Sequence, residues 1–198
     1  MELQGDIVNT VLAVNEVESY VIVGHSMGGY VALAFAEKYP EKVKGLVLFH
    51  STAYSDSEEK KKERLRTVEV VKANRNSFVA DLIPKLFSPK NQETLKTKIE
   101  EVKQLARKTP TEGITAALLG MSQRKDRTEV LKSADFPVLF IAGKDDGVIP
   151  FEKILEQVVF PKRSQLLLLE KTGHMGFIEA EKDCLYALEG FSKMCFSI

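Results

Sequence analysis

The side chains best suited to chemistry lie in residues 21–30, VIVGHSMGGY, where a Gly-x-Ser-x-Gly pattern surrounds Ser26. A β-branched run precedes the pattern, and residues 30–39 have the composition of a helix. A serine on such a strand–turn–helix junction is exposed at the edge of a sheet, where its hydroxyl can attack a carbonyl group. The Met27 N–H, at the helix start, would be free to stabilise the developing oxyanion.

The glycines around Ser26 matter because so sharp a turn forces strained backbone angles and brings strand and helix close together. We expect Gly24 and Gly28 to permit this approach and Gly29 to add room. A Gly-x-Ser-x-Gly string also arises by chance in glycine-containing loops. The strand before it and the helix after it favour a nucleophile.

A serine is a weak nucleophile at neutral pH and needs a base within hydrogen-bond reach, oriented by a third group. The chain has only three histidines. His25 adjoins Ser26, where we expect its side chain to diverge from the serine. His50 ends an expected strand, and two explanations are equally good for it: a residue that lines the pocket or an ordinary strand-end histidine. His174 lies in a glycine-flanked loop after the last expected strand. For the orienting acid, Asp145 and Asp146 both qualify by position.

The segment around Ser26 resembles the nucleophile turn of the serine hydrolases of the α/β-hydrolase family. Residues 173–179, GHMGFIE, are similar to the family's histidine loop, and this similarity makes His174 the expected general base. The order serine, aspartate, histidine along the chain is also the order that the family has.

The resemblance also favours one of the two aspartates. In the family the acid stands in a Gly-x-x-Asp pattern with proline four residues later, and Gly143, Asp146 and Pro150 match this spacing. Asp146 is therefore the expected acid, with Asp145 as the alternative.

The family resemblance implies a serine hydrolase that acts on a small carboxylic ester or related acyl substrate through an acyl-enzyme, with no metal or organic cofactor. The family also includes lactonases, thioesterases, acyltransferases, carbon–carbon bond hydrolases and aminopeptidases, which a shared fold does not separate. A dehalogenase is disfavoured, since that chemistry uses an aspartate where this chain has Ser26. A non-catalytic binding protein of the same fold is the alternative, although its usual signature, loss of a triad residue, is missing here.

Alternating strands and helices predict an α/β fold with a mostly parallel sheet. The expected strands are nearly continuous apolar runs, as strands buried on both faces of a sheet require. They cover residues 20–23, 43–49, 137–142 and 164–170, and further helices are expected at 151–159 and 180–193. Leu3, Ile7, Val11 and Val14 have helical spacing, so residues 2–17 should form an amphipathic helix that packs on the sheet.

Residues 51–135 interrupt this alternation with charge-rich helical segments at 58–66 and 96–108. Residues 109–112, TPTE, have the spacing of a capping box, which predicts a helix from 110 towards 124. We expect a first part of an α/β-hydrolase core in residues 1–50, a helical cap over the site in 51–135, and the second part of the core in 136–198. A solvated helical appendage is the alternative, but the apolar stripes of these helices favour a cap.

Charge and hydropathy limit the partners. Lys and Arg total 28 and Asp and Glu total 28, so the net charge is zero and no signal for nucleic acid or an anionic membrane is visible. The amino-terminal residues resemble no secretory signal, and no apolar run reaches the roughly 18 residues that span a bilayer, so we expect a cytoplasmic protein that binds a small acyl or ester substrate. Cys184 and Cys195 are expected to be reduced thiols.

The resemblance covers only the later part of the family's fold. No His-Gly pair, which usually supplies a second oxyanion N–H in the family, occurs in the chain. We expect either a truncated gene product, which we favour, or a partner that covers the open edge of the first strand. An exposed edge would also suit association of two copies of the chain. Loss of one oxyanion donor typically costs about 2.7–4 kcal/mol of transition-state stabilisation.

Overall fold

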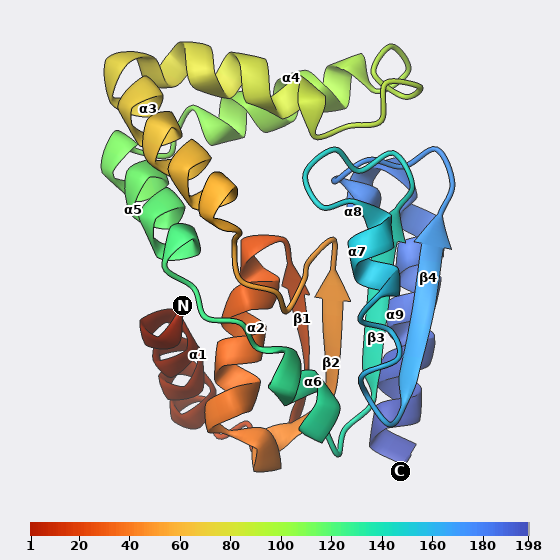
Figure 1. Cartoon of the computed structure of the whole chain (residues 1–198). Helices are drawn as coiled ribbons and strands as arrows, with labels where there is room; N and C mark the ends of the chain where they lie inside the picture. Colours follow the sequence, from red (N-terminus) through yellow and green to blue (C-terminus); the bar gives the residue numbers. More distant parts are fainter. Residues whose placement is uncertain (198) are drawn as a thin grey trace.

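Four parallel strands lie side by side in the order β1-β2-β3-β4, which is also their order along the chain (Figure 1). The structure, a computed structural model, describes residues 1–197. The strands are β1 (Tyr20–His25), β2 (Val43–Phe49), β3 (Val138–Gly143) and β4 (Ser164–Leu169). This arrangement confirms the expected α/β class and the parallel sheet.

Alternate residues of the central strands enter two separate apolar layers. Leu46 and Leu48 of β2 face one layer with Phe140 of β3, whereas Val47 and Ile141 face the other. Both layers are apolar because helices cover both faces of a parallel sheet, which explains the continuous apolar runs in the sequence.

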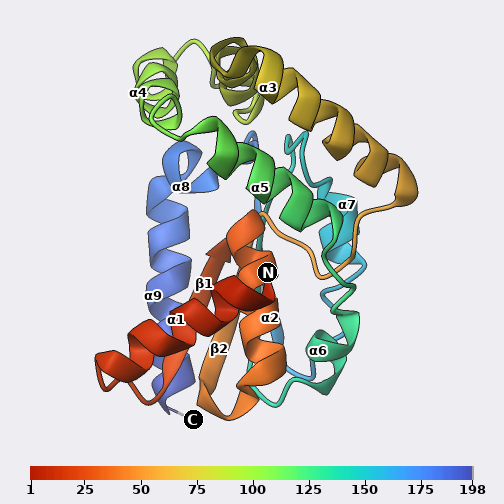
Figure 2. The ribbon, with the colours of Figure 1, turned by 90° about the vertical axis from the view of Figure 1, so that its left-hand side faces the viewer.

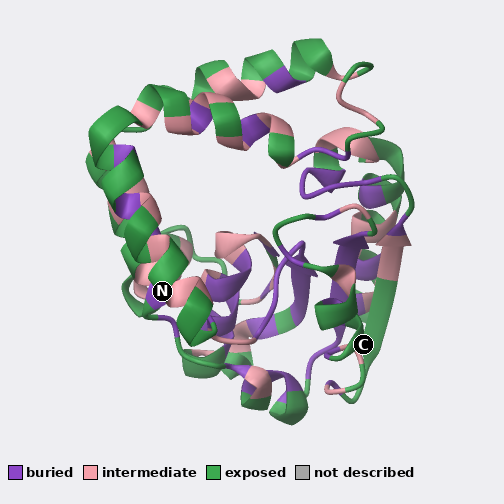
Figure 3. Ribbon diagram, turned by 45° about the horizontal axis from the view of Figure 1, so that its top comes forward, coloured by how far each residue is buried: buried purple, intermediate pink, exposed green. Residues whose placement is uncertain are grey.

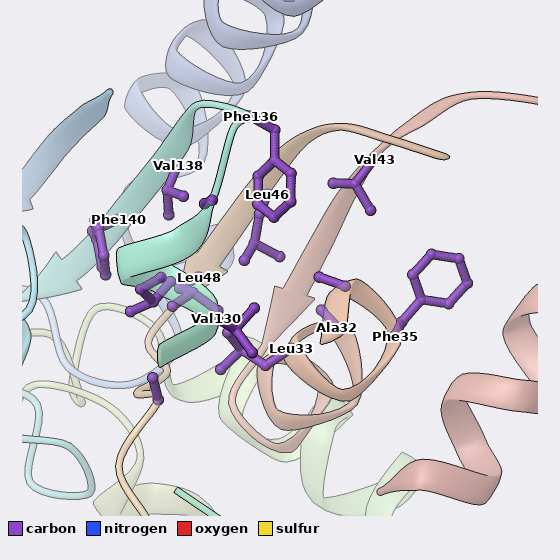
Figure 4. Close-up of a cluster of buried hydrophobic side chains, with 14 of the residues drawn as sticks. Ala32, Leu33, Phe35, Val43, Leu46, Leu48, Val130, Phe136, Val138 and Phe140 are labelled. Carbon is purple, nitrogen blue, oxygen red and sulfur yellow. The ribbon is translucent and has the colours of Figure 1, made fainter. Parts of the chain in front are cut away.

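The first layer lies between the sheet and helices α2 (Met27–Lys38), α6 (Thr128–Ser133) and α7 (Phe151–Leu155). In Figure 4, Leu33 of α2 and Val130 of α6 lie close to Leu48. The second layer lies beneath α9 (Glu181–Ser197), on the opposite side of the sheet (Figure 2). A 3₁₀ turn, η1 (Pro40–Lys42), and a short helix, α8 (Gly176–Glu179), complete this part.

The expected packing of the first helix on the sheet is wrong. Helix α1 (Glu2–Val14) packs against α2, and its buried position is Gly5, whose added Cβ would lie 3.3 Å from the Phe35 nitrogen. The predicted apolar stripe faces outward, with exposed fractions of 54–77% for Leu3, Ile7, Val11 and Val14. A small residue allowed close helix contact on the other face, and the spacing of large apolar residues did not reveal this.

Three helices stand above the carboxyl ends of the strands (Figure 1). They are α3 (Glu58–Lys85), α4 (Lys96–Ala106) and α5 (Thr111–Ser122). Helix α3 is much longer than the expected 58–66 and bends at Asn74, which has non-helical backbone angles. Much of the surface of these helices is exposed, whereas the central strands β2 and β3 are largely buried (Figure 3).

The predicted capping box is not formed. Pro110 is itself the N-cap residue of α5, and no side chain bonds to the free N–H groups of that helix start. The boundaries at residues 51 and 135 stay a prediction, although α6 within that range packs on the sheet with the first apolar layer.

Both outer strands of the sheet have solvent-accessible positions. Val23 in β1 is 49% exposed, and the first three residues of β4 are exposed. None of the helices formed by residues 1–197 combines the length and the apolar character that crossing a bilayer requires.

Candidate functional site

Each strand delivers one reactive side chain to the same edge of the sheet. Ser26 follows β1, His50 follows β2, Asp146 follows β3 within three residues, and His174 lies in the loop after β4. Backbone pairing continues past the strand ends, because Ser26 N–H donates to the Phe49 carbonyl at 2.9 Å. Carboxyl ends of parallel strands meet at one edge, so these side chains converge.

Ser26 occupies a strained turn. Its φ of 52° and ψ of −119° are unusual for a residue with a side chain. The Ser51 hydroxyl and the Gly29 N–H both donate to the Ser26 carbonyl, at 2.8 and 2.9 Å. These bonds hold the turn where β1 meets α2. Among the described residues, Met27 N–H donates to no acceptor, as expected at the first position of a helix.

The glycine requirement differs from the prediction at one position. A Cβ on Gly24 would lie 2.5 Å from the Gly28 carbonyl oxygen, and a Cβ on Gly29 would lie 2.1 Å from Ser51 Oγ. A Cβ on Gly28 would meet nothing within 4 Å. Gly24 and Gly29 therefore permit the close approach, and the expected role of Gly28 is wrong because its side-chain direction points into open space.

The structure brings three predicted residues into one hydrogen-bonded chain. Ser26 Oγ lies 2.8 Å from His174 Nε2, and His174 Nδ1 lies 2.8 Å from Asp146 Oδ2. An ionised carboxylate only accepts, so His174 carries its proton on Nδ1 and its Nε2 accepts from the Ser26 hydroxyl. His174 and Asp146 are both buried. This tautomer leaves Nε2 free to take a proton from Ser26.

Asp146 is held as a carboxylate by four donors. Its Oδ1 accepts from the backbone N–H groups of Val148 and Ile149, at 2.8 and 3.0 Å, and its Oδ2 faces His174 and His50. Burial acts to raise the pKa of Asp146, but the hydrogen bonds from the two imidazoles and the backbone outweigh it and hold that pKa far below its usual value. The carboxylate is therefore charged at any physiological pH.

Asp145, the alternative acid, points elsewhere. It accepts from Ser88 Oγ at 2.6 Å and pairs with Lys90 Nζ at 3.0 Å. Both partners lie in the segment that joins α3 to α4. Asp145 thus holds this segment to the loop after β3, and Asp146 is the aspartate that contacts His174.

The other two histidines lie beside the same chain of bonds. His25 Nε2–H donates to the backbone carbonyl of His174 at 2.8 Å, and burial lowers the pKa of His25 from 6.5 to about 4. His50, completely buried, lies 3.0 Å from Asp146 Oδ2 through its Nδ1. Neither contact was predicted. The sequence did contain one indication of these contacts. Both histidines lie at the carboxyl ends of neighbouring parallel strands, the same edge at which Ser26 and His174 are expected.

Glu179 is a further residue that the sequence analysis missed. Its Oε1 accepts from Gly173 N–H at 2.9 Å, and its Oε2 accepts from Ser88 N–H at 2.8 Å. His174 N–H in turn donates to the Leu86 carbonyl at 2.6 Å. The loop that carries His174 is therefore bonded directly to the segment between α3 and α4.

His50, Asp146 and His174 are residue types that bind metal ions, and one potential ligand atom from each lies within 4.8 Å of the others. The hydrogen bonds account for these atoms without an ion. Both Nδ1 atoms face Asp146, while the Nε2 atoms face Ser26 and the Gly176 N–H. The arrangement fits proton transfer between oxygen and nitrogen better than metal ligation.

A cleft of about 810 Å³ adjoins this edge of the sheet. Tyr30, one turn after Ser26 on α2, lines it together with Val148 and Ile149, which follow Asp146. The first turns of α3 and Arg124 beyond α5 form its other side. Arg124 lies 4.0 Å from the centre of the Tyr30 ring and pairs with buried Asp56, which also pairs with Arg64.

The sequence profile of the alpha/beta hydrolase fold matches residues 2–181. The chain belongs to the α/β-hydrolase family. Among curated members, it is 30% identical over 165 residues to 2-hydroxy-6-oxononadienedioate/2-hydroxy-6-oxononatrienedioate hydrolase 1 of Pseudomonas putida. The matched region covers 77% of this chain and 55% of the relative. It is 28% identical over 167 residues to the pimeloyl-[acyl-carrier protein] methyl ester esterase of Neisseria meningitidis, and the matched region covers 79% of this chain and 62% of that relative.

A solved esterase structure has the same fold as this chain. A thermophilic esterase from Thermogutta terrifontis superposes with a TM-score of 0.89 at 30% identity, over 96% of this chain and 70% of that one. The chain thus spans little more than half the length of the first curated relative.

Proposed function

We propose that this α/β-hydrolase is a serine hydrolase that acts on a small carboxylic ester or related acyl substrate. One observation carries the proposal: two 2.8 Å hydrogen bonds link Ser26 to His174 and His174 to Asp146. The strained turn that presents Ser26 and the unpaired N–H of Met27 support the same chemistry, within the residues that the structure describes.

In the proposed reaction, Ser26 Oγ attacks the carbonyl carbon while His174 Nε2 accepts the hydroxyl proton. The charged Asp146 stabilises the imidazolium that forms, and Met27 N–H donates to the oxyanion. Collapse of the tetrahedral intermediate breaks the ester bond, and the leaving alcohol takes the proton from His174. Water then attacks the acyl-enzyme with His174 again as base, which releases the acid and restores Ser26.

The cleft and the relatives bear on the substrate. The cleft beside the site would hold the acyl or alcohol part. The first turn of α3 lines this cleft, and we propose that α3 forms a cap together with α4 and α5. The named relatives include an esterase that acts on a methyl ester, which supports an ester substrate for this chain. A cytoplasmic location, the lack of nucleic-acid and membrane partners, and association through the β1 edge remain predictions.

Hydrolysis of p-nitrophenyl acetate and butyrate tests the proposal on wild type and Ser26→Ala. We expect the variant to lose at least about 10³-fold in kcat/KM, because the acyl acceptor is gone. Ser133→Ala, on α6, is the matched control and should keep full activity. Equal turnover by folded wild type and Ser26→Ala would overturn the enzyme proposal and leave the binding protein as the alternative.

A further inference from the structure

His50 has no place in the proposed reaction, yet it is completely buried beside the site, with an exposed fraction of 0%. Its two ring nitrogens both have partners. Nδ1 lies 3.0 Å from Asp146 Oδ2, and the Gly176 N–H donates to Nε2 over 3.2 Å. The ring stacks on Phe49 with its centre 5.1 Å away.

These partners fix where the imidazole proton sits. A backbone N–H only donates, so His50 Nε2 must be the unprotonated nitrogen, and Nδ1–H must donate to Asp146. A second proton on Nε2 would point at the Gly176 N–H. Burial also lowers the pKa of His50, which keeps the ring neutral.

Asp146 Oδ2 therefore accepts from two imidazoles at once, His174 at 2.8 Å and His50 at 3.0 Å. We propose that His50 is a positioning residue, a neutral Nδ1–H imidazole that holds the Asp146 carboxylate against His174 and takes up part of its hydrogen-bonding capacity. This inference rests on the proposed roles of Ser26, His174 and Asp146.

The surrounding backbone is built around this ring. His50 has a φ of 46°, in the left-handed region that costs energy for a residue with a Cβ. A Cβ on Gly176 would lie 2.4 Å from His50 Nε2, so that position requires glycine. The strained backbone of His50 and the need for glycine at position 176 both occur around the ring that contacts the Asp146 carboxylate.

Few charged or titratable groups surround this pair. His25 at the end of β1 has its ring centre 5.9 Å from that of His50, and His174 from the loop after β4 has its centre 5.6 Å away. Glu179 of α8 exerts a weaker influence on His50 than Asp146 of the loop after β3. Asp146 is the acid that hydrogen-bonds to His50, so the His50 N–H partly offsets the negative charge of Asp146 rather than that of Glu179.

The tautomer is measurable without any activity. In wild-type protein labelled with ¹⁵N-histidine, three histidines give separable ring signals, and His50→Asn identifies those of His50. We expect His50 to stay in the neutral Nδ1–H form at about pH 6.5, where free histidine is half protonated. An Nε2–H tautomer, or a ring that titrates near pH 6.5, would overturn the proposal even in an inactive protein.

Kinetics of two variants test the effect on the proposed base. His50→Asn suits the left-handed backbone, and its amide can still donate to Asp146. His50→Phe keeps a ring of similar size without a donor. We expect His50→Phe to lower kcat by about 10-fold and to move the acid limb of the kcat–pH profile to higher pH by about half a unit to one unit, because Asp146 then stabilises the imidazolium of His174 more strongly.

The Asn variant separates positioning from mere packing. His50→Asn should retain kcat within about 3-fold and leave the acid limb near its wild-type position, since the donor to Asp146 is restored. If both variants lose stability equally and neither moves the acid limb, His50 only fills space and the proposal fails. Absence of wild-type activity would instead count against the proposed function, while the tautomer measurement would still decide the place of the His50 proton.

Discussion

At the scale of single residues, the site depends on where a few protons lie. Asp146 accepts from four donors, His174 presents a free Nε2 lone pair to Ser26, and His25 holds the backbone of His174 from the other side. The carboxylate and the backbone carbonyl can only accept and the backbone N–H groups can only donate, which fixes the nitrogen that carries the proton in His174 and in His25. A change of one atom in such a side chain should therefore have a large effect on rate and a small one on fold.

Asp146→Asn is the sharpest change of this kind. The amide would donate towards His174 Nδ1 and so favour the wrong tautomer, which is expected to lower kcat by about 10³–10⁴-fold. Asp145→Asn is the matched control, because Asp145 bonds to Ser88 and Lys90 instead. Its kcat should fall by no more than a few-fold. Equal losses in steady-state ester hydrolysis by the two variants would contradict the assignment of Asp146.

Stability should fall as the solution becomes acidic. The folded-state pKa of His25 is lowered from 6.5 to about 4, so between these values the unfolded chain binds more protons than the folded one. The contribution of His25 to the free energy of unfolding is therefore fully present above about pH 6.5. It is lost progressively as pH falls towards 4, by at most about 3 kcal/mol.

Urea unfolding at pH 7, 5.5 and 4 measures this loss. His25→Gln removes the titrating ring and keeps an N–H that can reach the His174 carbonyl, so its stability should depend less on pH than that of wild type. His50, whose pKa is also lowered by burial, leaves a residual dependence of the same sign. Identical pH dependence in the two proteins would show that His25 is not protonated preferentially on unfolding.

At the scale of elements, the positions of a few small and charged residues decide how the strands meet the helices and how the insertion, formed by α3, α4 and α5 between β2 and β3, is held. In the turn between β1 and α2, Gly28 and Gly29 are neighbours with opposite surroundings. Gly29→Ala should distort the turn and reduce both stability and activity. Gly28→Ala should instead raise the free energy of unfolding by about 0.5–1 kcal/mol, because alanine suits a helix better than glycine.

The glycine pair is compared by thermal unfolding and ester hydrolysis of the two alanine variants. Loss of stability in Gly28→Ala together with a neutral Gly29→Ala would mean that the turn is packed differently from the structure.

Buried charges join the two ends of the insertion, because Asp56 precedes α3 and Arg124 follows α5. Asp56 lies between Arg64 of α3 and Arg124, and all three side chains are largely buried. Asp56→Ala would leave two buried guanidinium groups without their acid and should cost about 3–5 kcal/mol. Asp135→Ala removes an acid that is 87% exposed and should leave the free energy of unfolding almost unchanged. Chemical denaturation measures both, and similar costs would contradict a buried ion network.

At the scale of the whole molecule, the sequence predicts the sheet better than the insertion. Strands such as β2 and β3 are buried on both faces, so their apolar runs are continuous and easy to identify. The convergence of Ser26, Asp146 and His174 follows from the same parallel order. What the sequence could not predict depends on contacts with distant residues, such as the close packing of Gly5 on α2 and the length of α3.

The contacts of His50 and Glu179 escaped prediction for a related reason. Both residues act through partners that are remote in the sequence, Asp146 for His50 and Ser88 for Glu179. A histidine after a strand has no special spacing, and only the assembled sheet shows which carboxylate it meets.

The central claim, a Ser26 nucleophile activated by His174, is tested most directly by covalent labelling with a fluorophosphonate, read by intact mass. Wild type, His174→Ala and Ser26→Ala are compared after circular dichroism shows that all three are folded. The account predicts one added phosphonyl group on Ser26 of the wild type, labelling at least about 10²-fold slower in His174→Ala, and none in Ser26→Ala. Labelling of wild type and His174→Ala at the same rate, or no labelling of folded wild type, would contradict it.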